Sequence, residues 1–190
     1  MSPRARKLSL VVHIAASAGW IGAAVTSLVL AVLPLASGDP QLVRGIYLSL
    51  PVIGWYALVP FGVASLATGL IQSLGTTWGL LRHYWILVKL LMNLFATAVL
   101  LLYMQSLDYV ADQARAAPDA VVTSMGNPSP VVHALGAIAL LLVALVLSVY
   151  KPRGLTRRGR RHAATSPRPR RHASLATPRR VIAADRHAQP

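Results

Sequence analysis

The sequence predicts an all-α fold, a bundle of four transmembrane helices followed by a disordered, basic C-terminal tail. Long apolar runs, a hydrophobic content of 55% and a mean hydropathy of +0.54 are typical of a membrane protein. The charge is unevenly spread, because 12 of the 19 Lys and Arg residues follow Tyr150. We therefore expect a cytoplasmic N-terminus at 1–7, a four-helix transmembrane domain at 8–150 and a separate tail at 151–190.

The first span is predicted at 8–34, directly after three basic residues. Its apolar run exceeds the roughly 7–15 residues of a signal-peptide core, so we expect it to remain as a membrane helix. One face carries polar atoms at helical spacing. The residues on this face are His13, Ser17, Trp20, Ala24 and Ser27.

The second span is predicted at 51–73 and the fourth at 131–150, with loops at 36–49 and 108–130. Pro51 is expected in the first turn of the second span, and Pro60 is expected to kink that helix and free a carbonyl. The chain has no cysteine, which excludes disulfides, thiolate metal sites and a catalytic thiol.

The third span is predicted at 84–107 and contains one full cation, Lys89, five residues inside its start. Two interpretations stay open. The side chain can lie along the helix and lift its ammonium to the headgroups. Alternatively, Lys89, Asn93 and Thr97 follow one another at intervals of four residues and form a polar stripe along the helix. This stripe would face neighbouring helices and line a site.

The basic residues predict the orientation, since loops rich in Lys and Arg stay in the cytoplasm. The N-terminus, the loop before the third span and the tail carry most of them, so both termini are expected on the cytoplasmic side of the membrane. The first and third spans then run outward, which places His13 and Lys89 at the same depth near the cytoplasmic face. His133 enters from the opposite side and should not pair with His13.

The segments VVHIAASAGWIG, with His13 and Trp20 in an H-x6-W-x-G pattern, TTWGLLRHYWILVK and KPRGLTRRGRR resemble a family of small, uncharacterised bacterial four-helix integral membrane proteins over about residues 8–161. More distantly, the pattern is similar to copper-resistance protein D domains and to the small membrane protoporphyrinogen oxidase that binds haem b. In the latter family a first-helix histidine and a third-helix lysine are the functional residues. That resemblance implies the same roles for His13 and Lys89.

From the residues and this resemblance together we expect an integral membrane protein of unassigned, non-catalytic role, with a haem b or small-ligand site near the cytoplasmic face. The expected site comprises His13, Lys89, Trp20, Ser17 and Asn93, with His13 as the metal ligand, because imidazole ligates haem iron and an ammonium can neutralise a propionate. A haem-dependent oxidoreductase and a copper or small-ligand transporter stay open as alternatives. The chain has no glutamate and no carboxylate inside a predicted span, which argues against a carboxylate proton relay.

The tail has basic pairs, prolines and small residues without apolar periodicity, so we expect disorder. Its expected partner is the anionic surface of the lipid bilayer, which attracts basic clusters next to a membrane helix. Nucleic acid is a weaker alternative, because the tail lacks the aromatic side chains that stack on bases. Another membrane protein or a second copy of the chain stays open as a partner.

Overall fold

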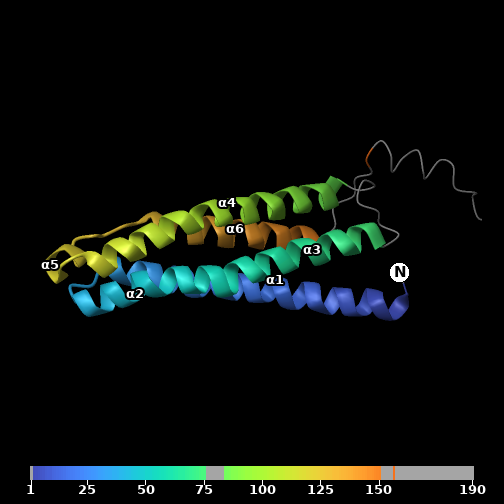
Figure 1. Cartoon of the computed structure of the whole chain (residues 1–190). Coiled ribbons are helices and arrows are strands. Elements are labelled where there is room, and N and C mark those ends of the chain that lie inside the picture. Colours follow the sequence, from blue (N-terminus) through green and yellow to red (C-terminus); the bar gives the residue numbers. More distant parts are fainter. Residues whose placement is uncertain (1, 76–83, 151–155, 157–190) are drawn as a thin grey trace, which may run out of the picture.

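The computed structural model describes residues 2–75, 84–150 and 156 (Figure 1). Those residues form helices and no strand, which confirms the all-α prediction. The predicted tail at 151–190 lies outside the described residues, apart from Thr156. The helices are α1 (Pro3–Val32) with a short 3-10 turn at Leu33–Leu35, α2 (Pro40–Ile53), a π-helical turn (Gly54–Leu58), α3 (Val59–Gly75), α4 (Tyr84–Ala116), α5 (Asp119–Val122) and α6 (Ser129–Tyr150).

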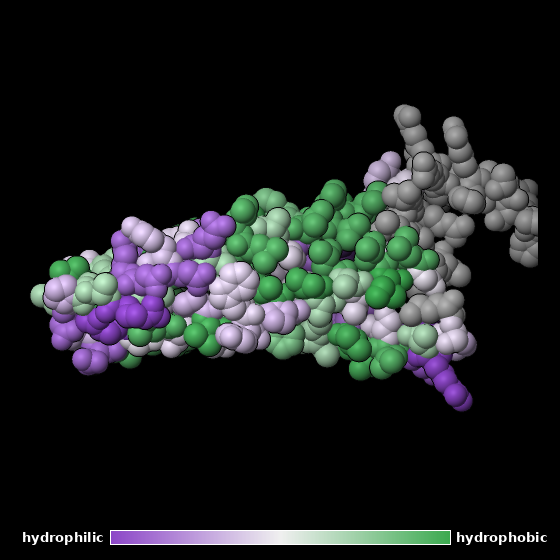
Figure 2. Space-filling view, in the orientation of Figure 1, coloured by the Kyte–Doolittle hydropathy of each residue, from purple (hydrophilic) through white to green (hydrophobic). Residues whose placement is uncertain are grey.

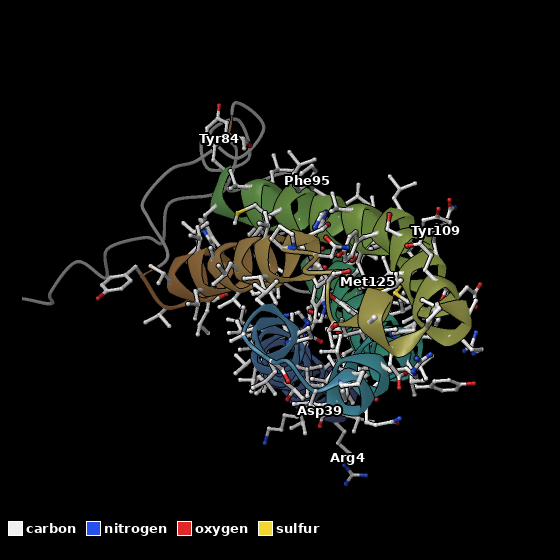
Figure 3. All side chains as sticks on the ribbon, turned by 90° about the vertical axis from the view of Figure 1, so that its left-hand side faces the viewer. Arg4, Asp39, Tyr84, Phe95, Tyr109 and Met125 are labelled. Carbon is white, nitrogen blue, oxygen red and sulfur yellow. The ribbon has the colours of Figure 1, made fainter. Side chains whose placement is uncertain are left out.

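The helices form a four-membered ring in which neighbours in sequence are neighbours in space (Figures 1 and 3). The helix α1 packs against α3 and α6, and α4 packs against the same two helices from the other side. Four helical stretches are long and apolar enough to cross a bilayer: 3–35, 40–75, 84–116 and 129–150. The chain is therefore a multi-pass membrane protein with the predicted four-helix bundle.

Three of these stretches are longer than a membrane requires. The run from α2 to α3 has 36 residues, α4 has 33 and α6 has only 22. At about 1.5 Å per residue, α6 matches a hydrocarbon core of about 30 Å, whereas the other two stretches, and the 33 residues of 3–35, are longer than it. Figure 1 shows α2 and the end of α4 extending beyond α6, where they carry α5. We call this region the α5 end, and Figure 2 shows that hydrophilic side chains gather there.

The predicted loop at 36–49 is wrong, because α2 already begins at Pro40. The Asp39 side chain caps the helix by accepting a hydrogen bond from the Gln41 N–H at 2.9 Å, and Pro40 occupies the first turn. Four apolar residues at helical spacing then bury one face of α2: Val43, Ile46, Tyr47 and Leu50. In the same way α4 continues to Ala116, so residues 108–116 of the predicted polar segment are also helical.

The two prolines lie differently from the prediction. Pro51 is near the end of α2, inside a continuous helical run rather than in its first turn. The chain accommodates Pro60 with the π-helical turn just before it, in which the Val59 N–H donates to the Gly54 carbonyl five residues back. Pro60 thus lies inside the continuous helical run from α2 to α3, directly after a turn with a changed hydrogen-bond pattern.

Packing differs between the two halves of the bundle. The side chains with no exposed surface all lie in the cluster at the α5 end: Val43, Met104, Ala114 and Val122. Inside the membrane region the buried residues are mostly small, such as Ala16, Ala24 and Ser65, while large apolar side chains such as Leu91 and Leu102 face outward. Lipid solvates apolar side chains as well as protein does, so close helix contacts there depend on small residues.

An arginine holds the α5 end together, and we call this contact the Arg44 cap. The Arg44 guanidinium donates to the backbone carbonyls of Ala114, Arg115 and Ala117, at the end of α4, and to the Asp119 carboxylate at 2.7 Å. The last carbonyls of a helix lack partners within the helix, and a cation there also complements the helix dipole. The cap therefore joins α2, α4 and α5.

Candidate functional site

The predicted site residues of α1 and α4 meet at one helix, α3. His13 is partly buried, and its Nδ1 lies 3.0 Å from the Thr68 hydroxyl. That hydroxyl is itself 2.6 Å from the carbonyl of Ala64, which can only accept, so the single hydroxyl proton of Thr68 is already used. Thr68 must then accept from His13. The contact therefore assigns the proton to Nδ1 and leaves the Nε2 lone pair of the neutral ring for another partner.

One helical turn farther along α1, three polar side chains converge. Ser17 Oγ is 2.9 Å from Ser65 Oγ, and the Asn93 amide nitrogen donates to the same Ser65 oxygen at 3.3 Å. Within the described part of the chain, Asn93 Oδ1 is buried without a hydrogen-bond partner. A buried polar atom left unpaired costs about 1–3 kcal/mol, so this oxygen marks a place where a donor is missing. Because the oxygen and nitrogen of an amide are assigned from their contacts, the unpaired atom is one of the two polar atoms of the Asn93 amide.

These contacts continue to the N-terminal end of α1, where the Gln72 amide donates to the Ser9 carbonyl at 3.1 Å. The result is a line of polar contacts between α1 and α3, which we call the polar seam. It pairs Ser9 with Gln72, His13 with Thr68, and Ser17 with Ser65. Residues four apart on α1 meet residues three and four apart on α3, as expected for two packed antiparallel helices.

Trp20 closes the polar seam on the side of the α5 end. Its side chain is 2% exposed and lies against Gly62 of α3, where an added Cβ would be 3.0 Å from the indole ring. A second glycine, Gly69, brings α3 close to His13, with its ideal Cβ position 3.3 Å from the imidazole Cε1. The two glycines therefore let α3 approach the aromatic residues of α1.

Lys89 stands beside the seam at the start of α4. Its ammonium is 5.5 Å from the centroid of the Trp85 ring, a cation–π distance, and its side chain is partly buried. It is also close enough to act electrostatically on His13. Of the five predicted site residues, four contact α3, namely His13, Ser17, Trp20 and Asn93, and Lys89 acts on His13 from the start of α4.

The sequence argument missed the side of the site that α3 provides. Thr68 and Ser65 are the direct partners of His13, Ser17 and Asn93, yet neither was predicted as a site residue. The available signal is the spacing of Ser65, Thr68 and Gln72, a polar stripe on an otherwise apolar helix. His133 lies apart from this site, at the start of α6, where it stacks on Tyr103.

Among the described residues there is no group of three or more His, Cys, Asp or Glu side chains that could hold a metal ion. A metal at the seam would thus have to arrive within a larger group, with His13 Nε2 as a single protein ligand. Comparison with known proteins adds no relative, because no family model, curated protein or solved structure matches the chain. The interpretation therefore depends on the geometry.

Proposed function

We propose that this membrane protein binds an anionic small ligand, with haem b as the candidate, at the polar seam near the cytoplasmic face. The observation that carries the proposal is the tautomer of His13. Because Thr68 fixes the proton on Nδ1, Nε2 presents its lone pair in the way that ligating histidines do when a second residue holds the other ring nitrogen.

Charge supports an anionic ligand. Lys89 places an ammonium within electrostatic range of His13 in a region of apolar helices, and a cation in such a place is usually paired or functional. In haem b the iron would take His13, and Lys89 would neutralise a propionate. The bound group would supply one-electron chemistry at its iron.

The unpaired amide oxygen of Asn93 supports a ligand at the same place. It lies next to Ser65 and Ser17, whose hydroxyls already contact each other. Haem b presents propionate acceptors rather than donors, so a water molecule that bridges this oxygen and a propionate would satisfy both. The residues thus suit a group that carries a metal with one open coordination position and an acidic substituent.

The spectroscopic test uses protein expressed with haem available and purified in detergent. Wild type should show a Soret band and a reduced-minus-oxidised difference spectrum, and His13→Ala should lose both. Thr68→Val keeps the shape of the side chain but removes the acceptor for Nδ1, so haem affinity should fall by about 10- to 100-fold. Lys89→Met should also weaken binding.

The matched control is His133→Ala, which removes an exposed histidine outside the seam and should leave the spectrum unchanged. Absence of a Soret band in the wild type would refute the haem proposal. A band that survives His13→Ala, or disappears in His133→Ala, would refute the ligand assignment.

The proposal includes the orientation, with both termini in the cytoplasm of a bacterium and the α5 end outside. The distribution of Lys and Arg supports it, and the basic tail is then placed to contact anionic lipid. Reporter fusions after Ser37 and after Pro128 should both report an external position. A cytoplasmic signal from either fusion would contradict this orientation.

A further inference from the structure

A second site, which shares only Trp20 with the five predicted site residues, lies between α1, α4 and α6. It is a cavity of about 260 Å³ whose walls are almost entirely apolar. Trp20 and Leu58 form its buried floor, and Phe95 and Val132 belong to its rim, where they are 62% and 64% exposed. Figure 3 shows Phe95 on the outer side of α4. The cavity therefore connects the interior of the bundle with the lipid-facing surface.

Two aromatic rings form a flat polar wall in this cavity. Tyr103 of α4 and His133 of α6 stack with ring centroids 3.6 Å apart and planes at 9°. Their position is near one end of α6, next to the level at which α2 and α4 continue beyond it. Aromatic side chains with polar tips are typical of the boundary between hydrocarbon and water. The wall thus lies where an amphiphile would place its headgroup.

The hydrogen bonds of His133 show which polar group this wall can recognise. Its Nδ1 lies 2.9 Å from the backbone carbonyl of Ser129, and a carbonyl only accepts. The proton of the neutral ring is therefore on Nδ1, and Nε2 is an acceptor. A ligand group that bonds to Nε2 must therefore be a donor, and the rest of the ligand should be apolar to match the remaining walls.

We propose that this cavity binds a lipid-soluble phenol, with its ring at the Tyr103–His133 wall, its hydroxyl donating to His133 Nε2 and its alkyl chain directed to Trp20 and Leu58. A phenol combines the three required properties: a planar ring for the aromatic wall, one donor, and an apolar chain for the apolar floor. The volume suits a small ligand, since pockets for drug-sized molecules begin at about 300 Å³. A lipid acyl chain fits the floor but offers no donor.

The test is photo-crosslinking in nanodiscs with para-octylphenol that carries a diazirine in its chain, followed by peptide mapping. Labelling should concentrate on the cavity-facing parts of α4 and α6. Unmodified para-octylphenol should displace the label at a concentration about fivefold lower than octylbenzene, which lacks only the hydroxyl. His133→Phe keeps a stacked ring but removes the acceptor, so this difference should fall below about twofold.

A cavity-filling variant gives an independent readout. Gly136 lines the cavity, and a Cβ added there would meet no atom within 4 Å, so the side chain of Gly136→Leu starts in open space. It should occupy part of the cavity and abolish competed labelling. Gly22→Leu is the matched control, because Gly22 also has open space but lies outside the cavity. Equal competition by octylbenzene and octylphenol in the wild type, or unchanged labelling in Gly136→Leu, would overturn the proposal. The assay contains no haem, so its outcome is independent of the function proposed for His13.

Discussion

Replacing Arg44 with methionine should open the α5 end. The variant keeps an unbranched apolar side chain in place of the arginine stem but loses the donors of the Arg44 cap. The bonds to the Ala114 and Ala117 carbonyls contribute about 1 kcal/mol each, as typical hydrogen bonds do. The ion pair adds only a few tenths of a kcal/mol, roughly, because the Asp119 side chain is 59% exposed. We therefore expect a loss of about 2 kcal/mol.

Hydrogen exchange of the backbone amides in 114–123 measures this loss where it occurs. A change of about 2 kcal/mol should reduce protection there by roughly 30-fold, while amides in the membrane part of α4 keep theirs. Arg115→Met is the matched control, because Arg115 pairs with Asp112 on the surface, with side chains 65% and 72% exposed, and should change little. Equal effects of Arg44→Met and Arg115→Met would refute this reasoning. So would an Asp119→Asn variant as damaging as Arg44→Met, because the carbonyl contacts would then be unimportant.

Two further substitutions test the packing of α3. Gly62→Ala should lower the free energy of unfolding by about 1–3 kcal/mol, because the new methyl group would be 3.0 Å from the Trp20 ring. Its control is Gly45→Ala, which meets open space and should be neutral or stabilising by up to about 1 kcal/mol. Equal effects of the two variants in an SDS unfolding titration would contradict this prediction. Ser65→Ala removes the hydrogen-bond partner that Ser17 and Asn93 share, and it should lower the free energy of unfolding by about 1–3 kcal/mol in the same titration. Its control is Thr26→Ala, which loses only an exposed hydrogen bond within its own helix and should cost less than roughly 0.5 kcal/mol. A Ser65→Ala variant as stable as wild type would contradict the contribution of these hydrogen bonds.

The four membrane helices could be predicted because each contains an apolar run of sufficient length. The helical extension at 40–53 could not be found by the same criterion. Asp39 precedes it and Pro40 and Arg44 lie near its start, so the mean hydropathy over this window is typical of a polar loop. The amphipathic spacing of its apolar residues and the cap signal at Asp39 were present in the sequence. The cap residue and the spacing of the apolar residues, taken by themselves, therefore predict this helix, whereas the mean hydropathy does not.

The site was predictable to the extent that it depends on one helix at a time. The polar faces of α1 and α4 follow from the spacing of His13 and Ser17, and of Lys89 and Asn93. The partners on α3 depend on which helices are neighbours and on their relative register, and periodicity within one helix does not contain that information. Periodicity alone therefore does not single out Thr68, although its contact determines the tautomer of His13.

The Arg44 cap also has a consequence for the order in which the molecule assembles. Its acceptors come 70 to 75 residues later in the chain than Arg44, beyond the third membrane crossing. Arg44 is therefore synthesised, and its helix placed in the membrane, well before the carbonyls of Ala114 and Ala117 exist. Contacts between distant parts of a chain form only after the intervening segments are in place. The formation of the Arg44 cap is thus a late step in folding, and it requires that α4 has already crossed the membrane.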